Sequence, residues 1–149
     1  MNYAEQRAAA FAALLERLAR EAGLPSATGA GLASRAASAP LLAALFTGDP
    51  TVNPESWDVC VVLPELLARV PGLAGCILNP DESARAATAY GVGKLPALVV
   101  LRDGQYLGVI EGMHDWQPFA AALDRLVSAP PRPVPVAGIY PDTRTARPA

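Results

Sequence analysis

The segment from Tyr90 to Gly112 constrains the fold more tightly than any other part of this chain. Glycines at positions 91 and 93 are suited to end a helix, because a residue without a Cβ can adopt positive φ. The dipeptide Leu95-Pro96 comes next, and proline forces the residue before it out of the helical region. The chain is therefore expected to leave a helix and straighten at this point.

A β-hairpin is predicted to follow this turn. Residues Ala97 to Leu101 form a short apolar run rich in β-branched side chains, which is typical of a buried strand. Asp103-Gly104 is one of the strongest short hairpin signals. Residues Gln105 to Glu111 then return as a second strand, which Gly112 ends.

The rest of the chain alternates between helical and strand patterns. Apolar residues at helical spacing predict helices, and short continuous apolar runs between turn residues predict strands that are covered on both faces. The expected elements are a helix over Tyr3 to Ala22, a loop over Ser26 to Ala39 with room for one helical turn at Leu32 to Ala37, a strand over Leu41 to Phe46, a loop over Thr47 to Ser56, a helix over Trp57 to Val70, a strand over Leu73 to Leu78, a helix over Asp81 to Tyr90, and a last helix after Asp115.

Prolines bear on two of these helices. Pro64 leaves two possibilities, because proline is tolerated in a first helical turn and costs about 3 kcal/mol in a helix interior. Either the helix begins near Val62, or it is kinked at Pro64. Asp115 is expected to cap the last helix, with Pro118 in its first turn. The buried stripe of that helix is expected to comprise Trp116, Phe119, Ala120, Leu123, Leu126 and Val127.

The order of elements is helix, β-α-β, helix, β-hairpin, helix. A β-α-β unit gives a parallel strand pair and the hairpin adds antiparallel strands, so we expect an α/β/α sandwich with a central mixed sheet, of the thioredoxin-like class. Residues 91–101 also resemble the thioredoxin signature in which a proline opens the third strand with a cis peptide bond. That resemblance predicts a cis bond between Leu95 and Pro96. Residues 1–129 are expected to form this single domain, and residues 130–149 a Pro-rich tail that is extended and mobile.

The composition limits the possible functions. With 52% hydrophobic residues the chain can bury a substantial core, and its net charge of -2 argues against nucleic acid as the main partner. No apolar run reaches the roughly 18 residues of a membrane span. The first ten residues lack the basic and apolar regions of a secretory signal. We therefore expect a cytoplasmic protein.

The position at which thioredoxins carry their redox centre has no thiol in this chain. In thioredoxins a Cys-x-x-Cys lies between the first core strand and the next helix, where the helix N-terminus lowers the pKa of the first thiol. Residues 46–58, which form that junction here, contain no cysteine. Asp49, Glu55 and Asp58 occupy it instead, and a carboxylate would oppose a neighbouring thiolate. Dithiol exchange is therefore excluded at this place.

The two cysteines, Cys60 and Cys76, are 16 residues apart, and together with the single histidine, His114, they cannot supply the four ligands of a structural zinc site. We expect no metal and no cofactor. Both cysteines are expected to be core residues, and His114 is expected at the surface or near the helix cap. The alternative is a monothiol redox enzyme that uses Cys60, which requires that thiol to be exposed at a helix N-terminus with a lowered pKa.

The segment from Gly91 to Trp116 resembles the HyaE/HupG family of hydrogenase-formation proteins. The specific part is a Gly-x-Tyr-x-Gly-Val strand followed by Gly-Met-His-Asp-Trp, because ordinary thioredoxins do not place histidine and tryptophan there. Weaker similarity runs upstream through Gly48-Asp-Pro and a Pro-Glu-Leu-Leu-Ala-Arg helix. The resemblance covers roughly Pro40 to Val127.

This resemblance implies a non-catalytic, thioredoxin-like assembly chaperone of the cytoplasm. The client that it implies is the precursor of the small subunit of an uptake nickel–iron hydrogenase, which carries iron–sulfur clusters and a twin-arginine signal peptide. The chaperone would hold this precursor before export, and other hydrogenase assembly proteins are further expected partners. The resemblance identifies no catalytic residue.

A peptide-binding face is the physical form that this function would take. Thioredoxins hold extended substrates beside the proline-led strand by backbone pairing, and carboxylates can bind arginine in a bidentate manner. Our hypothesis places the client on the former active-site face, which is acidic and apolar. Its candidate residues are Asp49, Glu55, Trp57, Asp58, Lys94, Leu95 and Pro96.

Other roles are open for several of these residues. Trp57 can equally be a core residue, Lys94 a solvated loop charge, and the three carboxylates turn and cap residues. A third functional alternative is a scaffold whose Pro-rich tail binds a partner.

Overall fold

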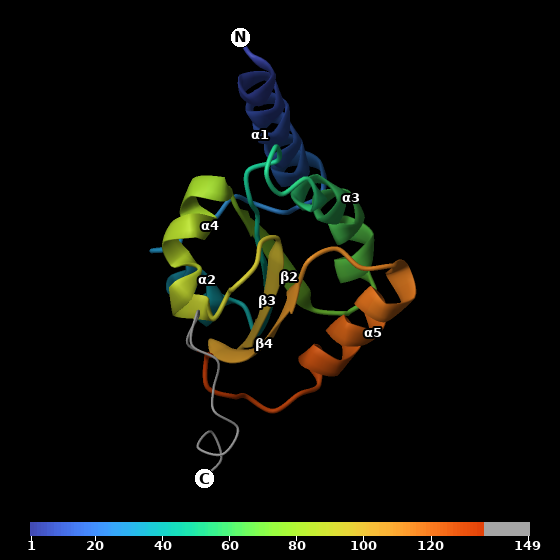
Figure 1. The fold of residues 1–149 in the computed structure, drawn as a ribbon. Coiled ribbons are helices and arrows are strands. Elements are labelled where there is room, and N and C mark those ends of the chain that lie inside the picture. The colour runs from blue at the N-terminus through green and yellow to red at the C-terminus, as the bar shows by residue number, and fades with distance from the viewer. Residues whose placement is uncertain (136–149) are drawn as a thin grey trace.

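The computed structural model describes residues 1–135; of the tail predicted over residues 130–149 to be mobile, residues 136–149 lie outside the described part. A four-stranded mixed sheet lies between two layers of helices (Figure 1). The predicted α/β/α sandwich is therefore confirmed. Its elements are α1 Tyr3–Glu21, α2 Leu32–Ser38, β1 Leu41–Phe46, α3 Glu55–Ala68, β2 Leu73–Leu78, α4 Pro80–Ala86, the 3-10 turn η1 Thr88–Tyr90, β3 Ala97–Arg102, β4 Gln105–Glu111 and α5 Trp116–Val127.

The strand order in the sheet is β2-β1-β3-β4. The first strand, β1, runs parallel to β2 and antiparallel to β3, so that Phe46 at its end pairs with Leu78 on one side and Ala97 on the other. All residues of β1 after Leu41 are buried, as a strand with both faces covered requires. The hairpin between β3 and β4 turns at Asp103-Gly104, where both residues have positive φ.

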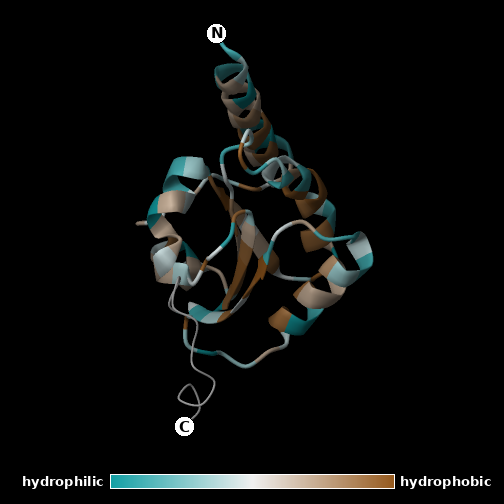
Figure 2. Ribbon diagram, viewed as in Figure 1, coloured by the Kyte–Doolittle hydropathy of each residue, from teal (hydrophilic) through white to brown (hydrophobic). Residues whose placement is uncertain are grey.

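Each face of the sheet carries its own hydrophobic core. Helices α1, α3 and α5 pack on one face, with Phe11, Leu63 and Phe119 among the buried side chains. Helices α2 and α4 pack on the other face, around Leu32 and Phe46. Figure 2 shows the strands as largely hydrophobic and the helices as mixed, which is the pattern of amphipathic helices on a buried sheet. No helix among residues 1–135 has the length and apolar character to cross a bilayer.

Helix α3 corrects one sequence prediction. It begins at Glu55, two residues before the predicted Trp57, so of the two alternatives for Pro64 the start near Val62 is wrong and Pro64 lies in the helix interior. Pro64 cannot donate a backbone hydrogen bond to the preceding turn, which costs about 3 kcal/mol. Four apolar side chains of α3 that are at least nine-tenths buried offset that cost: Val59, Leu63, Leu66 and Leu67.

The last helix also differs in detail. Asp115 occupies the N-cap position, but its side chain makes no capping hydrogen bond. Trp116, expected in the buried stripe, is 42% exposed, while Phe119 and Leu123 are buried as predicted. The first residue of α5 is therefore presented to solvent and not to the core.

The helix predicted over residues 81–90 is divided into α4 and η1. The Asn79 side chain accepts a hydrogen bond from the Glu82 N–H at 2.9 Å and so caps α4, with Pro80 as its first residue. Gly91 then ends η1 with a left-handed φ of 68°, which confirms the predicted role of this glycine.

Candidate functional site

Hydrogen bonds to buried hydroxyl groups hold the start of the loop after β1 in place. The Thr47 N–H donates to Ser83 Oγ at 2.8 Å, and Thr47 Oγ1 donates to the Leu78 carbonyl at 2.7 Å. The next amide, that of Gly48, donates to Ser56 Oγ in the first turn of α3 at 2.8 Å. These bonds satisfy the backbone where β1 ends, so the loop between Gly48 and α3 has a defined position.

The turn before β3 is held by a carboxylate that the sequence analysis missed. The peptide bond between Leu95 and Pro96 is cis. Glu111, the last residue of β4, accepts hydrogen bonds at Oε2 from the Gly93 N–H at 2.8 Å and from the Lys94 N–H at 3.1 Å. The only sequence signal for this role is its position directly before Gly112, opposite the start of β3.

The loop and this turn lie side by side, as the sequence hypothesis expected. Asn53 Nδ2 donates to the Leu95 carbonyl at 3.4 Å. Glu55 Oε1 accepts a hydrogen bond from the Met113 N–H at 3.2 Å. A Cβ added at Gly112 would lie 3.6 Å from both Glu55 Oε1 and Lys94 Nζ, so these two side chains converge over that glycine. Among residues 1–135, the N–H of Leu95 has no hydrogen-bond partner.

Next to this turn lies a pocket that we call the acidic groove. Three carboxylates line it, from Glu55 and Asp58 on α3 and from Asp115 before α5. Its other lining residues are Val62, Met113, His114, Trp116 and Phe119, so no lysine or arginine among the described residues lines it. An exposed indole ring beside three carboxylates is suited to bind a guanidinium group that is attached to an apolar segment.

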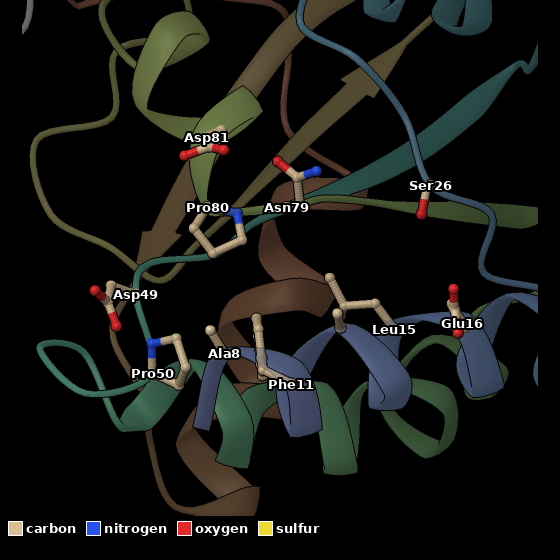
Figure 3. A pocket seen from close by; sticks show the side chains of 11 residues that line it. Ala8, Phe11, Leu15, Glu16, Ser26, Asp49, Pro50, Asn79, Pro80 and Asp81 are labelled. Atoms are coloured by element: carbon tan, nitrogen blue, oxygen red, sulfur yellow. The ribbon is translucent and has the colours of Figure 1, made fainter. Parts of the chain in front are cut away.

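Asp49 lies apart from the acidic groove. Its Oδ1 accepts hydrogen bonds from the Thr51 N–H at 2.8 Å and from Thr51 Oγ1 at 2.7 Å, and these bonds hold the pKa of the carboxyl below its usual value. Figure 3 shows Asp49 and Pro50 at the rim of a different pocket, with Phe11 of α1 and Asp81 of α4 also lining it. Asp49 therefore acts as a turn residue, the alternative role that the sequence left open for it.

Trp57 also points away from the groove. Its ring packs against Phe11 of α1, with ring centroids 5.8 Å apart, and the Arg7 guanidinium lies 5.0 Å from its ring centroid. The side chain is half-buried. Of the seven candidate residues, the structure thus brings together Glu55, Asp58, Lys94, Leu95 and Pro96 around the groove and the turn, and places Asp49 and Trp57 against α1.

The two thiols lie on opposite faces of the sheet. Cys60 is fully buried in the core beneath α3, and burial raises its pKa to about 12. Cys76 is fully buried in the other core, and burial raises its pKa to about 11. A monothiol enzyme requires the opposite environment for Cys60, an exposed thiol with a lowered pKa. Residues 1–135 contain no group of three or more side chains placed to hold a metal ion.

A thiol-labelling experiment checks this placement. We expect neither Cys60 nor Cys76 to react with an aromatic disulfide reagent at pH 7 in the native protein, because both are buried and protonated. Both should react at once in denaturant, which serves as the control. Rapid native labelling of Cys60, mapped by mass spectrometry, would contradict the structure and revive the monothiol alternative.

His114 also lines the acidic groove. Its Nε2 lies 2.7 Å from the Glu111 carbonyl oxygen, and its ring contacts Phe119 edge-on with centroids 5.6 Å apart. The residue is exposed and lies next to the N-cap of α5, in agreement with the predicted surface role. It links the end of β4 to Phe119 of α5.

Solved structures confirm the fold class. A mutant thioredoxin from Halobacterium salinarum NRC-1 superposes with a TM-score of 0.58 over 72% of this chain and 93% of the thioredoxin, at 22% sequence identity. At that identity the likeness establishes a thioredoxin-like fold and nothing about activity.

Sequence comparisons establish the family. The hydrogenase expression/formation protein HoxO from Azotobacter vinelandii is 36% identical over 103 residues, which cover 69% of this chain and 70% of HoxO. HupG from Bradyrhizobium diazoefficiens, which has the same description, is 34% identical over 87 residues, or 58% of this chain and 59% of HupG. The family model of the hydrogenase-1 expression protein HyaE matches residues 14–119, from α1 to α5, and so includes both the cis-proline turn and the acidic groove. The chain therefore belongs to the HyaE family of hydrogenase expression proteins.

Proposed function

We propose that this protein is a non-catalytic chaperone that binds the precursor of a hydrogenase small subunit through its twin-arginine signal peptide and holds it in the cytoplasm before export. The observation that carries the proposal is the acidic groove beside the cis-proline turn. Other hydrogenase assembly proteins are further partners under this proposal.

The cis-proline turn supplies backbone groups for an extended peptide. The N–H of Leu95 is free of partners among the described residues, and its carbonyl has only the 3.4 Å contact with Asn53. Main-chain pairing gives affinity that does not depend on the peptide sequence, and neighbouring side chains then add specificity. Glu111 holds the two residues before Leu95, so the turn is already ordered when the peptide arrives.

The acidic groove supplies the specificity. A guanidinium group forms charge-assisted, bidentate hydrogen bonds with a carboxylate, and Glu55 and Asp58 lie one helical turn apart on α3. Two adjacent arginines can therefore meet two carboxylates. The apolar segment that follows them in such a signal peptide fits against Val62, Met113 and Trp116.

The proposal is tested with the double substitution Glu55→Gln and Asp58→Asn. We expect it to weaken binding of the small-subunit signal peptide about fivefold to tenfold, because exposed charge pairs contribute roughly 0.2–1 kcal/mol each. Fluorescence anisotropy of a labelled peptide measures the affinity. The matched control is Asp49→Asn with Asp81→Asn, which removes two carboxylates from the pocket in Figure 3.

The control variant should bind the peptide as the unmodified protein does. A peptide in which glutamine replaces both arginines should bind weakly. Its affinity for the groove variant and for the control variant should be the same. Equal affinity of the groove variant and the unmodified protein for the arginine peptide would refute the assignment of the groove.

A further inference from the structure

We propose that the C-terminal segment of this same chain, residues 136–149, binds in the acidic groove and competes with the client there. The inference rests on the proposed function only for the identity of the competing client. The occupancy of the groove by the segment is a separate claim and can be tested without any client.

Hydrogen bonds attach the part of the chain that follows α5 to the sheet. Arg102 on β3 donates from Nη1 to the Val127 carbonyl at 2.9 Å and from Nη2 to the Ala129 carbonyl at 2.6 Å. Three residues further on, the Arg132 N–H donates to the Tyr106 carbonyl on the edge strand β4 at 2.9 Å. Residues up to 132 are therefore attached to the domain and do not hang free from the end of α5.

The described chain ends against the start of the cis-proline loop. A Cβ added at Gly91 would lie 2.8 Å from Pro135 Cδ and 3.2 Å from Val134 Cγ1, so this part of the chain touches Gly91. Gly91 opens the loop that leads to Leu95 and the groove. The segment beyond Pro135 thus starts on the same loop that the client face uses.

The segment is long enough to reach the groove. Arg147 is twelve residues beyond Pro135, and an extended chain advances about 3.3 Å per residue, which gives a reach of roughly 40 Å. A compact domain of this size has a radius of gyration of about 14 Å. This reach is comparable to the width of the domain, and the groove is near the starting point, because Glu111 contacts Gly93 and Glu55 contacts Met113.

The composition of the segment matches the groove. It contains two arginines, Arg144 and Arg147, one aspartate, and the apolar pair Ile139-Tyr140 on their N-terminal side. The groove offers three carboxylates, an exposed indole and no basic side chain among its lining residues. The segment therefore carries the same combination of guanidinium and apolar groups as the proposed client, and complementary charge favours its binding in the groove.

Because the segment belongs to the same chain, its ability to compete with a client depends on its effective concentration at the groove. For a short connection this is roughly millimolar, so even a weak intramolecular contact occupies the groove for much of the time. A client must displace it, and its apparent affinity falls by the fraction of molecules in which the groove is free. The segment would thus reject weakly binding peptides and release the groove to a true client.

Spin labelling of the full chain tests occupancy directly. Because Cys60 and Cys76 are fully buried, Ala146→Cys gives a single accessible thiol for a nitroxide label. We expect the label to broaden the indole N–H resonance of Trp116 and the amide of Asp115. In a second variant that adds Glu55→Gln and Asp58→Asn, the broadening should be lost, whereas Asp49→Asn with Asp81→Asn should leave it unchanged.

The functional consequence is tested with Arg144→Gln and Arg147→Gln in the full chain. We expect this variant to bind the labelled signal peptide severalfold more tightly than the unmodified protein. If the Trp116 resonance is not broadened and both proteins bind the peptide equally, the tail inference is wrong while the proposed function stands. If the resonance is broadened but neither protein binds the peptide, the proposed function is wrong while the segment still occupies the groove.

Discussion

Replacing Phe46 with alanine should lower the free energy of unfolding by about 3–5 kcal/mol, the usual cost of deleting a buried aromatic ring. Phe46 is fully buried at the end of β1, and its ring packs against Tyr90 with centroids 5.8 Å apart. It is also the last residue before the loop that positions Glu55. Urea denaturation followed by circular dichroism measures the change.

Two further variants serve as controls for this prediction. Phe46→Leu should recover most of the lost stability, since it leaves a smaller cavity. Tyr3→Ala removes an aromatic ring that is 71% exposed, and it should change the free energy of unfolding by no more than about 0.5 kcal/mol. A loss of less than about 1 kcal/mol in Phe46→Ala, with an unchanged dependence on urea, would mean that this site is not the tightly packed core described here.

The sequence predicted the sheet well because its signals are local and strong. The apolar run of β1 and the Asp103-Gly104 turn each determine their own structure, and the bounds of β1, β2 and β4 agree with the expectation. The helix predicted over Trp57 to Val70 is observed over Glu55–Ala68, but the sequence left open whether it continues through Pro64. The proline inside that helix predicts a boundary locally, and only the packing of α3 against α1 and the sheet overrides it.

The candidate site was predicted in part. Glu55, Asp58 and the residues of the cis-proline turn are brought together by the fold class, which the sequence indicated. The role of Glu111 depends on hydrogen bonds to residues 17 and 18 positions away, and no periodicity encodes such a contact.

The sequence pattern also does not show which way a side chain points. Trp57 and Trp116 both occur near a helix start with apolar neighbours, so both could be core or surface residues. The structure packs Trp57 against Phe11 of α1, whereas Trp116 at the start of α5 stays 42% exposed beside the groove. The better candidate for client binding is thus the tryptophan that the sequence assigned to the core.

Trp116→Ala should weaken binding of the small-subunit signal peptide about thirtyfold, with little change in stability. The ring is 42% exposed in the free protein and lines the acidic groove beside Asp115. A tryptophan in that position can stack on a guanidinium group and cover the apolar part of the peptide. Truncating such an interface residue typically costs about 2 kcal/mol or more, which corresponds to this loss of affinity.

The second tryptophan provides the matched control. Trp57→Ala should lower the free energy of unfolding, because the ring packs against Phe11 and beneath Arg7, and it should leave the affinity for the peptide unchanged. In Trp57→Phe, Trp116 is the only remaining indole, so its fluorescence reports peptide binding directly. If Trp57→Ala abolishes binding and Trp116→Ala does not, the client binds on the α1 side of the loop, next to Asp49, and the acidic groove is not its site.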